Sequence, residues 1–285
     1  MSWKRVFFVS VTQCCLTQSP SGRAPEGQHE SMASLAGVLP GESMAVGDGE
    51  GDPMHVRKLV LEVQDSPCLR AGKSFVITAN GLKQSTRRMN DGRTIVGTEA
   101  GTCDIVLSPD DPELGKMHFV IEFNQANECF TIKDLGEGNG TFMKIEGSHT
   151  LHNGDVLSFG ASHAGVQIQS QGSASTLTLR FFEGPRANDM LSFGSNDEFI
   201  KIGRVPDCAI VIDDNGLSRY QCMIQHQRGK GWVVIDGDGG RKSANGTWLY
   251  LDRDFRVTNG MTIKAGKTLF KVKVTQASWV EERRS

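Results

Sequence analysis

Asn139-Gly140-Thr141-Phe142 recurs in the second half of the chain as Asn245-Gly246-Thr247-Trp248, 106 positions further on. Asn153-Gly154 recurs as Asn259-Gly260 with the same offset, and Gly97 recurs as Gly203. A single Asn-Gly pair marks only a tight turn. Three glycine-bearing anchors in one register indicate an internal repeat, which constrains the architecture of the whole chain.

The segments around these anchors are short, rich in Val, Ile, Phe and Thr, and separated by Gly, Asn, Asp and Pro. Almost none of them shows the 3.6-residue apolar period of a helix. We expect strands at Val56–Val63, Ser74–Thr78, Phe119–Phe123, Leu177–Phe182, Phe199–Ile202 and Leu269–Val274. The pattern therefore predicts an all-β protein with two tandem β-sandwiches.

The repeat also divides the chain. We expect a disordered leader over residues 1–54, a first copy over 55–169, a short linker over 170–175, a second copy over 176–277 and a tail over 278–285. Much of the leader is rich in Ser, Gly, Glu and Pro, a composition that buries too little apolar surface to order itself. Below, residues 55–169 are called the first copy and residues 176–277 the second copy.

Charge and hydropathy exclude several classes of partner. The 285 residues contain 31 Lys and Arg against 33 Asp and Glu, so no large field of one sign attracts nucleic acid or a membrane surface. No apolar run is long enough for a membrane helix. Lys4 and Arg5 precede a short apolar run, which leaves an N-terminal targeting signal as an alternative to a cytoplasmic or nuclear location.

Cysteine and histidine usage argues against a disulfide framework, a metal site or a cofactor. The seven cysteines are an odd number, form no C-x-x-C pair and have no histidine at zinc-finger spacing. Cys103 and Cys208 lie in short apolar runs, where we expect small buried side chains. The seven histidines form no metalloprotease motif, and the chain lacks a nucleophile elbow, a P-loop and a dinucleotide fingerprint. We therefore expect no catalytic residues.

The second copy carries Gly203-Arg204, then Leu217-Ser218-Arg219-Tyr220-Gln221, then Asn245-Gly246-Thr247, then Asn259-Gly260. This order resembles the forkhead-associated (FHA) family, whose pattern is G-R, S-R-x-H and N-G-T/S before a later N/D-G turn. The resemblance covers both copies, over about residues 56–276, and does not extend to the leader or the last few residues. It implies β-sandwiches that bind phosphothreonine peptides through loops at one end.

The resemblance implies phosphopeptide-binding roles for Arg204, Ser218, Arg219 and Asn245. Arg204 would present a planar fork of donors to the phosphate, and Ser218 would add a hydroxyl hydrogen bond. Arg219 would contact the phosphate or the peptide backbone, and the Asn245 amide would hold the peptide main chain. Taken singly, Arg204 could be a solvated surface charge and Asn245 a turn former. Gln221 replaces the family's histidine, a change that we expect to weaken the site without abolishing it.

The first copy departs further from the pattern. Thr98 stands where the family has arginine, and Gly115 stands where it has the phosphate-binding serine, whereas His118 and Asn139 remain. Hydrogen bonds to a charged group contribute about 1.5–3 kcal/mol each, so losing two weakens binding on the order of a hundredfold or more. We expect Lys116, as a point charge, to restore a little of the lost phosphate binding. We expect the first copy to be structural or to dock a partner without phosphate.

The loop before the Asn-Gly-Thr turn is four residues longer in the second copy, and the insertion contains or flanks Arg241 and Lys242. Our hypothesis is that these cations select acidic residues C-terminal to the phosphothreonine. Asp213 and Asp214 on the neighbouring loop favour the opposite preference.

Two functions follow from these patterns. The first is an adaptor that binds a threonine-phosphorylated protein through the second copy. The alternative is a scaffold whose contacts do not depend on phosphate. The identity of the partner and the oligomeric state are left open.

Overall fold

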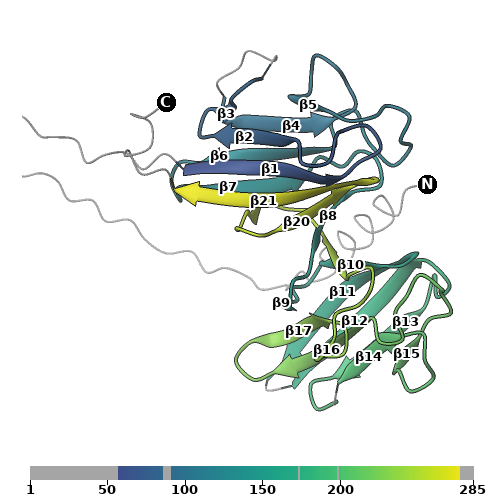
Figure 1. Cartoon of the computed structure of the whole chain (residues 1–285). Coiled ribbons are helices and arrows are strands. Elements are labelled where there is room, and N and C mark those ends of the chain that lie inside the picture. Colours follow the sequence, from purple (N-terminus) through teal and green to yellow (C-terminus); the bar gives the residue numbers. More distant parts are fainter. Residues whose placement is uncertain (1–56, 86–90, 173, 198, 277–285) are drawn as a thin grey trace, which may run out of the picture.

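The computed structural model describes residues 57–85, 91–172, 174–197 and 199–276 (Figure 1). All regular secondary structure in these residues is β, which confirms the predicted fold class. No described segment forms a helix that could cross a bilayer. The expected leader, with its targeting question, and the expected tail lie outside the described residues.

Strands in the first copy form in the order of the expected sandwich. They are β1 (Arg57–Asp65), β2 (Ser74–Thr78), β3 (Gly81–Leu82), β4 (Arg93–Gly97), β5 (Ile105–Val106), β6 (Phe119–Asn124), β7 (Cys129–Asp134), β8 (Thr141–Lys144), β9 (Ser148–Thr150), β10 (Val156–Phe159) and β11 (Ser162–Gln171).

The second copy follows with a similar series. Its strands are β12 (Ala174–Glu183), β13 (Met190–Gly194), β14 (Ile200–Gly203), β15 (Ile210–Val211), β16 (Cys222–Gln227), β17 (Gly231–Asp236), β18 (Trp248–Tyr250), β19 (Phe255–Arg256), β20 (Thr262–Ala265) and β21 (Thr268–Gln276). The six strands expected from the sequence coincide with β1, β2, β6, β12, β14 and β21 to within a few residues.

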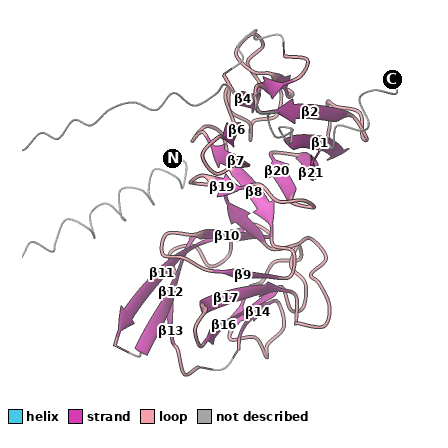
Figure 2. Ribbon diagram, turned by 90° about the vertical axis from the view of Figure 1, so that its left-hand side faces the viewer, coloured by secondary structure: helices cyan, strands magenta, loops and turns pink. Residues whose placement is uncertain are grey.

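The strands form two lobes that share one long sheet (Figures 1 and 2). This sheet has eleven strands in the order β13-β12-β11-β10-β18-β8-β20-β21-β1-β2-β3. A five-stranded sheet, β19-β7-β6-β4-β5, completes the lobe that contains β1, and another, β15-β14-β16-β17-β9, completes the lobe that contains β12. We call these the first lobe and the second lobe.

Neither lobe is made from one copy alone, because the copies exchange their C-terminal strands. In the first copy, β9 pairs with β17, and β11 pairs with β12, so residues from 145 onward belong to the second lobe. In the second copy, β19 pairs with β7, and β21 pairs with β1 over nearly its whole length, so residues from 251 onward belong to the first lobe. The two sandwiches thus do not coincide with the two copies defined by the repeat.

The hydrophobic cores are mixed in the same way. The core of the first lobe combines Leu59 and Phe119 of the first copy with Phe270 of the second. The core of the second lobe combines Phe159 of the first copy with Trp232 of the second. Since each core buries apolar side chains from both copies, burial couples the folding of one copy to that of the other.

The chain crosses between the lobes on two strands that pair with each other. β8 and β18 run antiparallel, with Met143 opposite Leu249. The Tyr250 hydroxyl, at the end of β18, donates a 2.7 Å hydrogen bond to Oδ1 of Asp134 in the first lobe. Burial, followed by the charge and hydrogen bond of Asp134, raises the pKa of Tyr250, so the phenol stays protonated and remains a donor.

The connection between the copies accounts for this arrangement. Gln171 pairs with Ala174, so β11 and β12 form a hairpin with only two residues between them. Gly172 has a φ of +61°, as the tightest hairpin turns require. This differs from the linker expected over residues 170–175. Three Cα–Cα steps separate Gln171 from Ala174 and span at most about 11 Å, so the last strand of the first copy and the first strand of the second lie side by side in one sheet.

The crossing strands offer a test of how strongly the lobes depend on each other. Tyr250→Phe removes a buried hydrogen bond to a carboxylate and should lower the free energy of unfolding by about 1–2 kcal/mol. Because the cores are shared, we expect one cooperative transition in urea instead of one for each lobe, with coincident curves from far-ultraviolet circular dichroism, which reports both lobes, and from tryptophan fluorescence, which reports Trp232 of the second lobe.

Tyr220→Phe is the matched control. The Tyr220 hydroxyl also binds a carboxylate, Oδ2 of Asp207 at 2.6 Å, but this pair is exposed. Its loss should change stability by less than about 0.5 kcal/mol. Two separate transitions, or equal effects of the two substitutions, would contradict the coupling of the lobes.

Candidate functional site

Three loops of the second copy meet at one end of the second lobe. Arg204 follows β14, Ser218 and Arg219 precede β16, and Asn245 precedes β18. The Arg204 backbone N–H donates to the carbonyls of Ser218 and Arg219, at 3.4 and 3.2 Å. The Ala244 N–H donates to Ser218 Oγ at 2.8 Å. The structure therefore brings together the four residues that the sequence singled out as phosphopeptide-binding.

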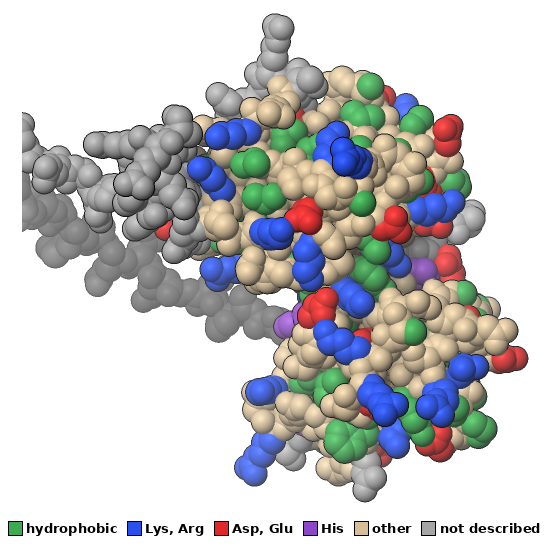
Figure 3. Space-filling view, viewed as in Figure 1, with side chains coloured by type: hydrophobic (Ala, Val, Ile, Leu, Met, Phe, Trp, Pro, Cys, Tyr) green, Lys and Arg blue, Asp and Glu red, His purple; other side chains and the backbone are tan. Residues whose placement is uncertain are grey.

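The polar groups of this end face solvent. Arg204, Arg219 and Asn245 are exposed, and Ser218 is half-buried. Among the described residues neither guanidinium forms an ion pair, so both charges are available to an anion. Basic and acidic side chains are otherwise interspersed on the face seen in Figure 3, consistent with a local anion site and not a broad basic surface.

The Asn245 side chain is already oriented in this structure. Its Nδ2 donates to the carbonyl of Gly216 at 2.9 Å, which ties the Asn-Gly-Thr turn to the loop that carries Ser218. The side-chain oxygen remains an acceptor. The Ser218 hydroxyl accepts from Ala244, so its own proton remains available for donation to a ligand.

Gln221 performs the structural task of the histidine that it replaces. Gln221 is buried; its Oε1 accepts from the Ser218 N–H at 3.1 Å, and its Nε2 donates to the Gly246 carbonyl at 3.0 Å. In the first copy, His118 Nδ1 accepts from the Gly115 N–H, and its Nε2 lies 3.2 Å from the Gly140 carbonyl. Both side chains thus link the same two loops, and the amide makes equivalent bonds.

Both copies keep a glycine before the arginine position for a steric reason. A Cβ on Gly203 would lie 2.1 Å from the Arg219 carbonyl oxygen, and a Cβ on Gly97 would lie 2.1 Å from that of Lys116. This close approach of two loops needs glycine whether or not arginine follows. The presence of Gly97 is therefore explained by the close approach of the two loops and is no evidence of a phosphate site.

The longer loop of the second copy contacts the first copy. Lys242 Nζ forms a 2.7 Å ion pair with Oε2 of Glu146, which directly follows the first copy's crossing segment. The hydrogen bond from Lys242 lowers the pKa of Glu146, and the same bond raises the pKa of Lys242. Arg241 is exposed and makes no ion pair in the described structure. Of the two cations expected to select the peptide, only Arg241 is free.

Two further contacts from the first copy support the site. The Ala161 N–H donates to Asp214 Oδ2 at 2.8 Å, which holds the loop that leads to Ser218. A Cβ on Gly246 would lie 2.4 Å from Cε of Lys144, so Lys144 packs against the Asn-Gly-Thr turn. Sequence reasoning missed these contacts because nothing in the repeat indicates that strands are exchanged.

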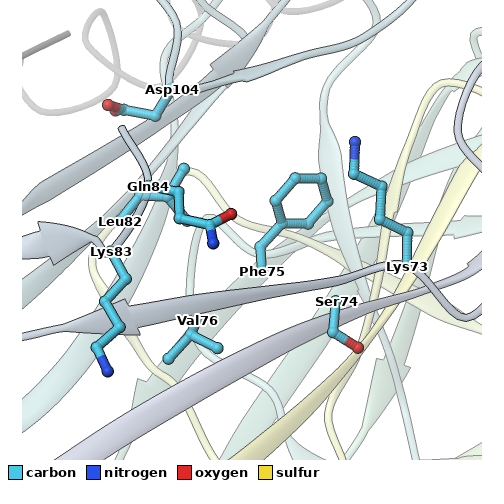
Figure 4. Close-up of a pocket in the computed structure, with 8 residues that line it drawn as sticks. All are labelled: Lys73, Ser74, Phe75, Val76, Leu82, Lys83, Gln84 and Asp104. Carbon is cyan, nitrogen blue, oxygen red and sulfur yellow. The ribbon is translucent and has the colours of Figure 1, made fainter. Parts of the chain in front are cut away.

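A separate pocket of about 330 Å³ lies on the first lobe (Figure 4). Phe75, Val76 and Leu82 contribute apolar surface, and Lys73 and Lys83 contribute positive charge. The Lys73 ammonium lies 5.0 Å from the centre of the Phe75 ring. This pocket is formed by β2 and the β3 region, so it is distinct from the three loops described above.

Comparison with known proteins identifies the fold of both copies. The family model of the FHA domain matches residues 92–160 and 200–269. The chain contains two FHA domains. FHA domains are generally phosphothreonine-binding modules without catalytic activity. Among solved structures, the chain is similar to the FHA domain of a hypothetical protein of Arabidopsis thaliana, with 13% identity, coverage of 81% of this chain and 96% of that one, and a TM-score of 0.32. No curated protein matches the chain.

In the first FHA domain, the Glu137 side chain fills the space that a serine side chain at position 115 would need. A Cβ on Gly115 would lie 2.1 Å from Cβ of Glu137, and Oε2 of Glu137 accepts the Met117 N–H at 2.9 Å. Thr98 is half-buried, and its hydroxyl donates to the Gly115 carbonyl. Negative charge therefore stands where the second FHA domain offers donors.

The remaining polar residues of the first FHA domain do not replace the lost donors. Lys116 is exposed, but its ammonium lies 3.7 Å from a carboxylate oxygen of Glu99. Asn139 is exposed and is positioned by its backbone N–H, which donates to the Glu113 carbonyl at 2.7 Å. The loop frame is kept, while Arg204 and Ser218 of the second FHA domain have no equivalent donor side chains in the first.

The contact between Gly115 and Glu137 can be tested by a double-mutant cycle. Gly115→Ser should destabilise the chain by about 1–3 kcal/mol, since the new Cβ has no space. Glu137→Gly removes the obstructing Cβ, so Gly115→Ser should cost less in that background. Equal costs in the two backgrounds, measured by urea denaturation, would show that Glu137 does not fill this position.

Proposed function

We propose that this chain is a phosphothreonine-peptide adaptor that binds through its second FHA domain, while the first FHA domain has a structural or phosphate-independent docking role. The observation that carries the proposal is the convergence of Arg204, Ser218, Arg219 and Asn245 on three hydrogen-bonded loops, with both guanidiniums free of ion pairs. Its partner would be a threonine-phosphorylated protein.

The geometry supports a division of labour at the second site. Arg204 and the Ser218 hydroxyl would donate hydrogen bonds to phosphoryl oxygens. These bonds are strong because the acceptor is charged. Arg219, beside Ser218, would contact the phosphate or the peptide backbone with a second guanidinium. Asn245 projects from the turn and can bond the peptide main chain. Since the loops are tied together before any ligand arrives, little ordering is required on binding.

Titration calorimetry of the whole chain with a phosphothreonine peptide pool tests this proposal. The unphosphorylated pool should bind far more weakly. Arg204→Ala should weaken phosphopeptide binding by about 10- to 150-fold, the effect expected for the loss of a hydrogen bond to a charged group. Because Arg204 is exposed, the unfolding midpoint should hardly change.

Arg228→Ala is the matched control, since Arg228 is an exposed arginine in the turn between β16 and β17. It should bind like the unchanged chain. If both pools bind equally, or if Arg204→Ala has no effect, the phosphate-independent scaffold becomes the better account. The carboxylate of Glu137 at the first site makes that second function plausible for the first FHA domain.

Selection of acidic residues next to the phosphothreonine would depend on the pairing of Lys242. Glu146→Gln removes the carboxylate that holds Lys242 and returns a positive charge to the loop. We expect affinity for a peptide with acidic residues C-terminal to phosphothreonine to rise by about two- to fivefold, in keeping with an exposed pair.

The comparison peptide has alanine at the same positions, and its affinity should not change. Lys242→Gln in the Glu146→Gln background should reverse the gain. An equal gain for both peptides would mean that the loop does not read the flanking sequence.

A further inference from the structure

Three potential metal ligands lie together in the second lobe, away from the phosphopeptide site. His149 lies in β9, and His152 and Asp155 follow at intervals of three residues before β10. Their ligand atoms all lie within 4.8 Å of one another. Oδ2 of Asp155 is 3.8 Å from Nε2 of His149 and 3.7 Å from Nδ1 of His152.

The His149 imidazole carries the clearest indication of a missing ligand. Its Nε2 is buried and has no hydrogen-bond partner. A buried ring nitrogen is normally satisfied by protein, water or an ion, so such an atom calls for a partner. His152 is 62% exposed, so solvent reaches the group from its side.

The carboxylate is held in the orientation that such a site needs. Asp155 is buried. Its Oδ1 accepts a 2.7 Å hydrogen bond from the Arg253 guanidinium, and its Oδ2 accepts a 2.9 Å hydrogen bond from the backbone N–H of His152. Outer hydrogen bonds of this kind fix a ligating carboxylate. The arginine also places positive charge near the group, which would lower its affinity for a cation.

We propose that His149, His152 and Asp155 bind a divalent transition-metal ion, with Zn²⁺ the best match to two imidazoles and one carboxylate. Ligand atoms of a tetrahedral zinc ion lie about 3.3 Å apart. The two separations from Asp155 exceed this by about half an ångström, and no two ligand atoms are more than 4.8 Å apart, so small rotations of both imidazoles would bring the three groups to bonding distance of one ion. Three protein ligands leave a fourth position for water.

The proposed metal site lies beside the exchanged strands. β9 is a first-copy strand paired with β17 of the second copy, and Arg253 lies between β18 and β19, where the second copy crosses to the first lobe. All three ligands lie within residues 149–155, so a bound ion would fix this segment, which contacts the second copy through β17 and Arg253, and would stabilise the folded chain by binding only to it. The sequence expectation of no metal rested on cysteine pairs and zinc-finger spacing, which this triad does not have.

The experiment is a Co²⁺ titration of the full chain, followed by visible absorption. One equivalent should produce the d–d bands of tetrahedral cobalt, without the near-ultraviolet charge transfer that thiolate ligands add. Loss of a residue that only hydrogen-bonds to a metal ligand weakens metal binding about 10- to 100-fold. Replacing two ligands, as in His149→Gln with His152→Gln, should weaken binding more and remove the bands at one equivalent. Zn²⁺ should raise the unfolding midpoint of the unchanged chain and not that of the double variant.

His226→Gln is the control, because His226 packs against Trp232 and lies outside the triad. It should retain both the bands and the Zn²⁺ stabilisation. The proposal is overturned if no d–d bands form, if they persist in the double variant, or if thiolate charge transfer accompanies them.

Discussion

The two-residue connection between β11 and β12 is the constraint on which the rest of the structure depends. It makes the last strand of the first copy and the first strand of the second copy neighbours in one hairpin. The position beside β1 is then taken by β21, the last strand of the second copy. From this pairing follow the shared eleven-stranded sheet, the two mixed cores and the paired crossing strands β8 and β18. Short connections are a known route to exchanged elements, and here the exchange takes place within one chain.

This interlocking gives a physical reason for a chain to keep a first FHA domain that has Thr98 and Gly115 where the second has Arg204 and Ser218. The first copy supplies β9, β10 and β11 to the lobe that carries Arg204 and Ser218. Its Ala161 backbone holds Asp214, its Lys144 supports the Asn-Gly-Thr turn, and Glu146 holds Lys242. The first copy can therefore diverge at its own loops, where Glu137 now stands, while its C-terminal strands remain necessary to the second site.

Much of the fold could be predicted from the sequence, because repeated turns and alternating strands are local signals. The meeting of the loops that carry Arg204, Ser218, Arg219 and Asn245 could be predicted for the same reason, since each residue lies at a fixed place in a spaced motif. Replacement of histidine by Gln221 preserved the link between the loops because an amide, like an imidazole, offers both a donor and an acceptor. Strand exchange could not be predicted from the repeat. The repeat shows that the two copies are similar in sequence, but it does not show which copy supplies the strand that pairs with β1 or β12. The pair formed by Lys242 and Glu146, 96 positions apart, became visible only with that exchange.

The most direct test of this account is which strand lies beside β1. Val60 pairs with Lys273 across β1 and β21, whereas a closed first copy would place Gln167, the equivalent residue of β11, opposite Val60. In a background with Cys14, Cys15 and Cys68 replaced by serine, the pair Val60→Cys and Lys273→Cys should form an intramolecular disulfide in the monomer, seen as faster migration without reductant. The pair Val60→Cys and Gln167→Cys should not. The opposite result would show that each copy closes on itself and would contradict the exchanged architecture.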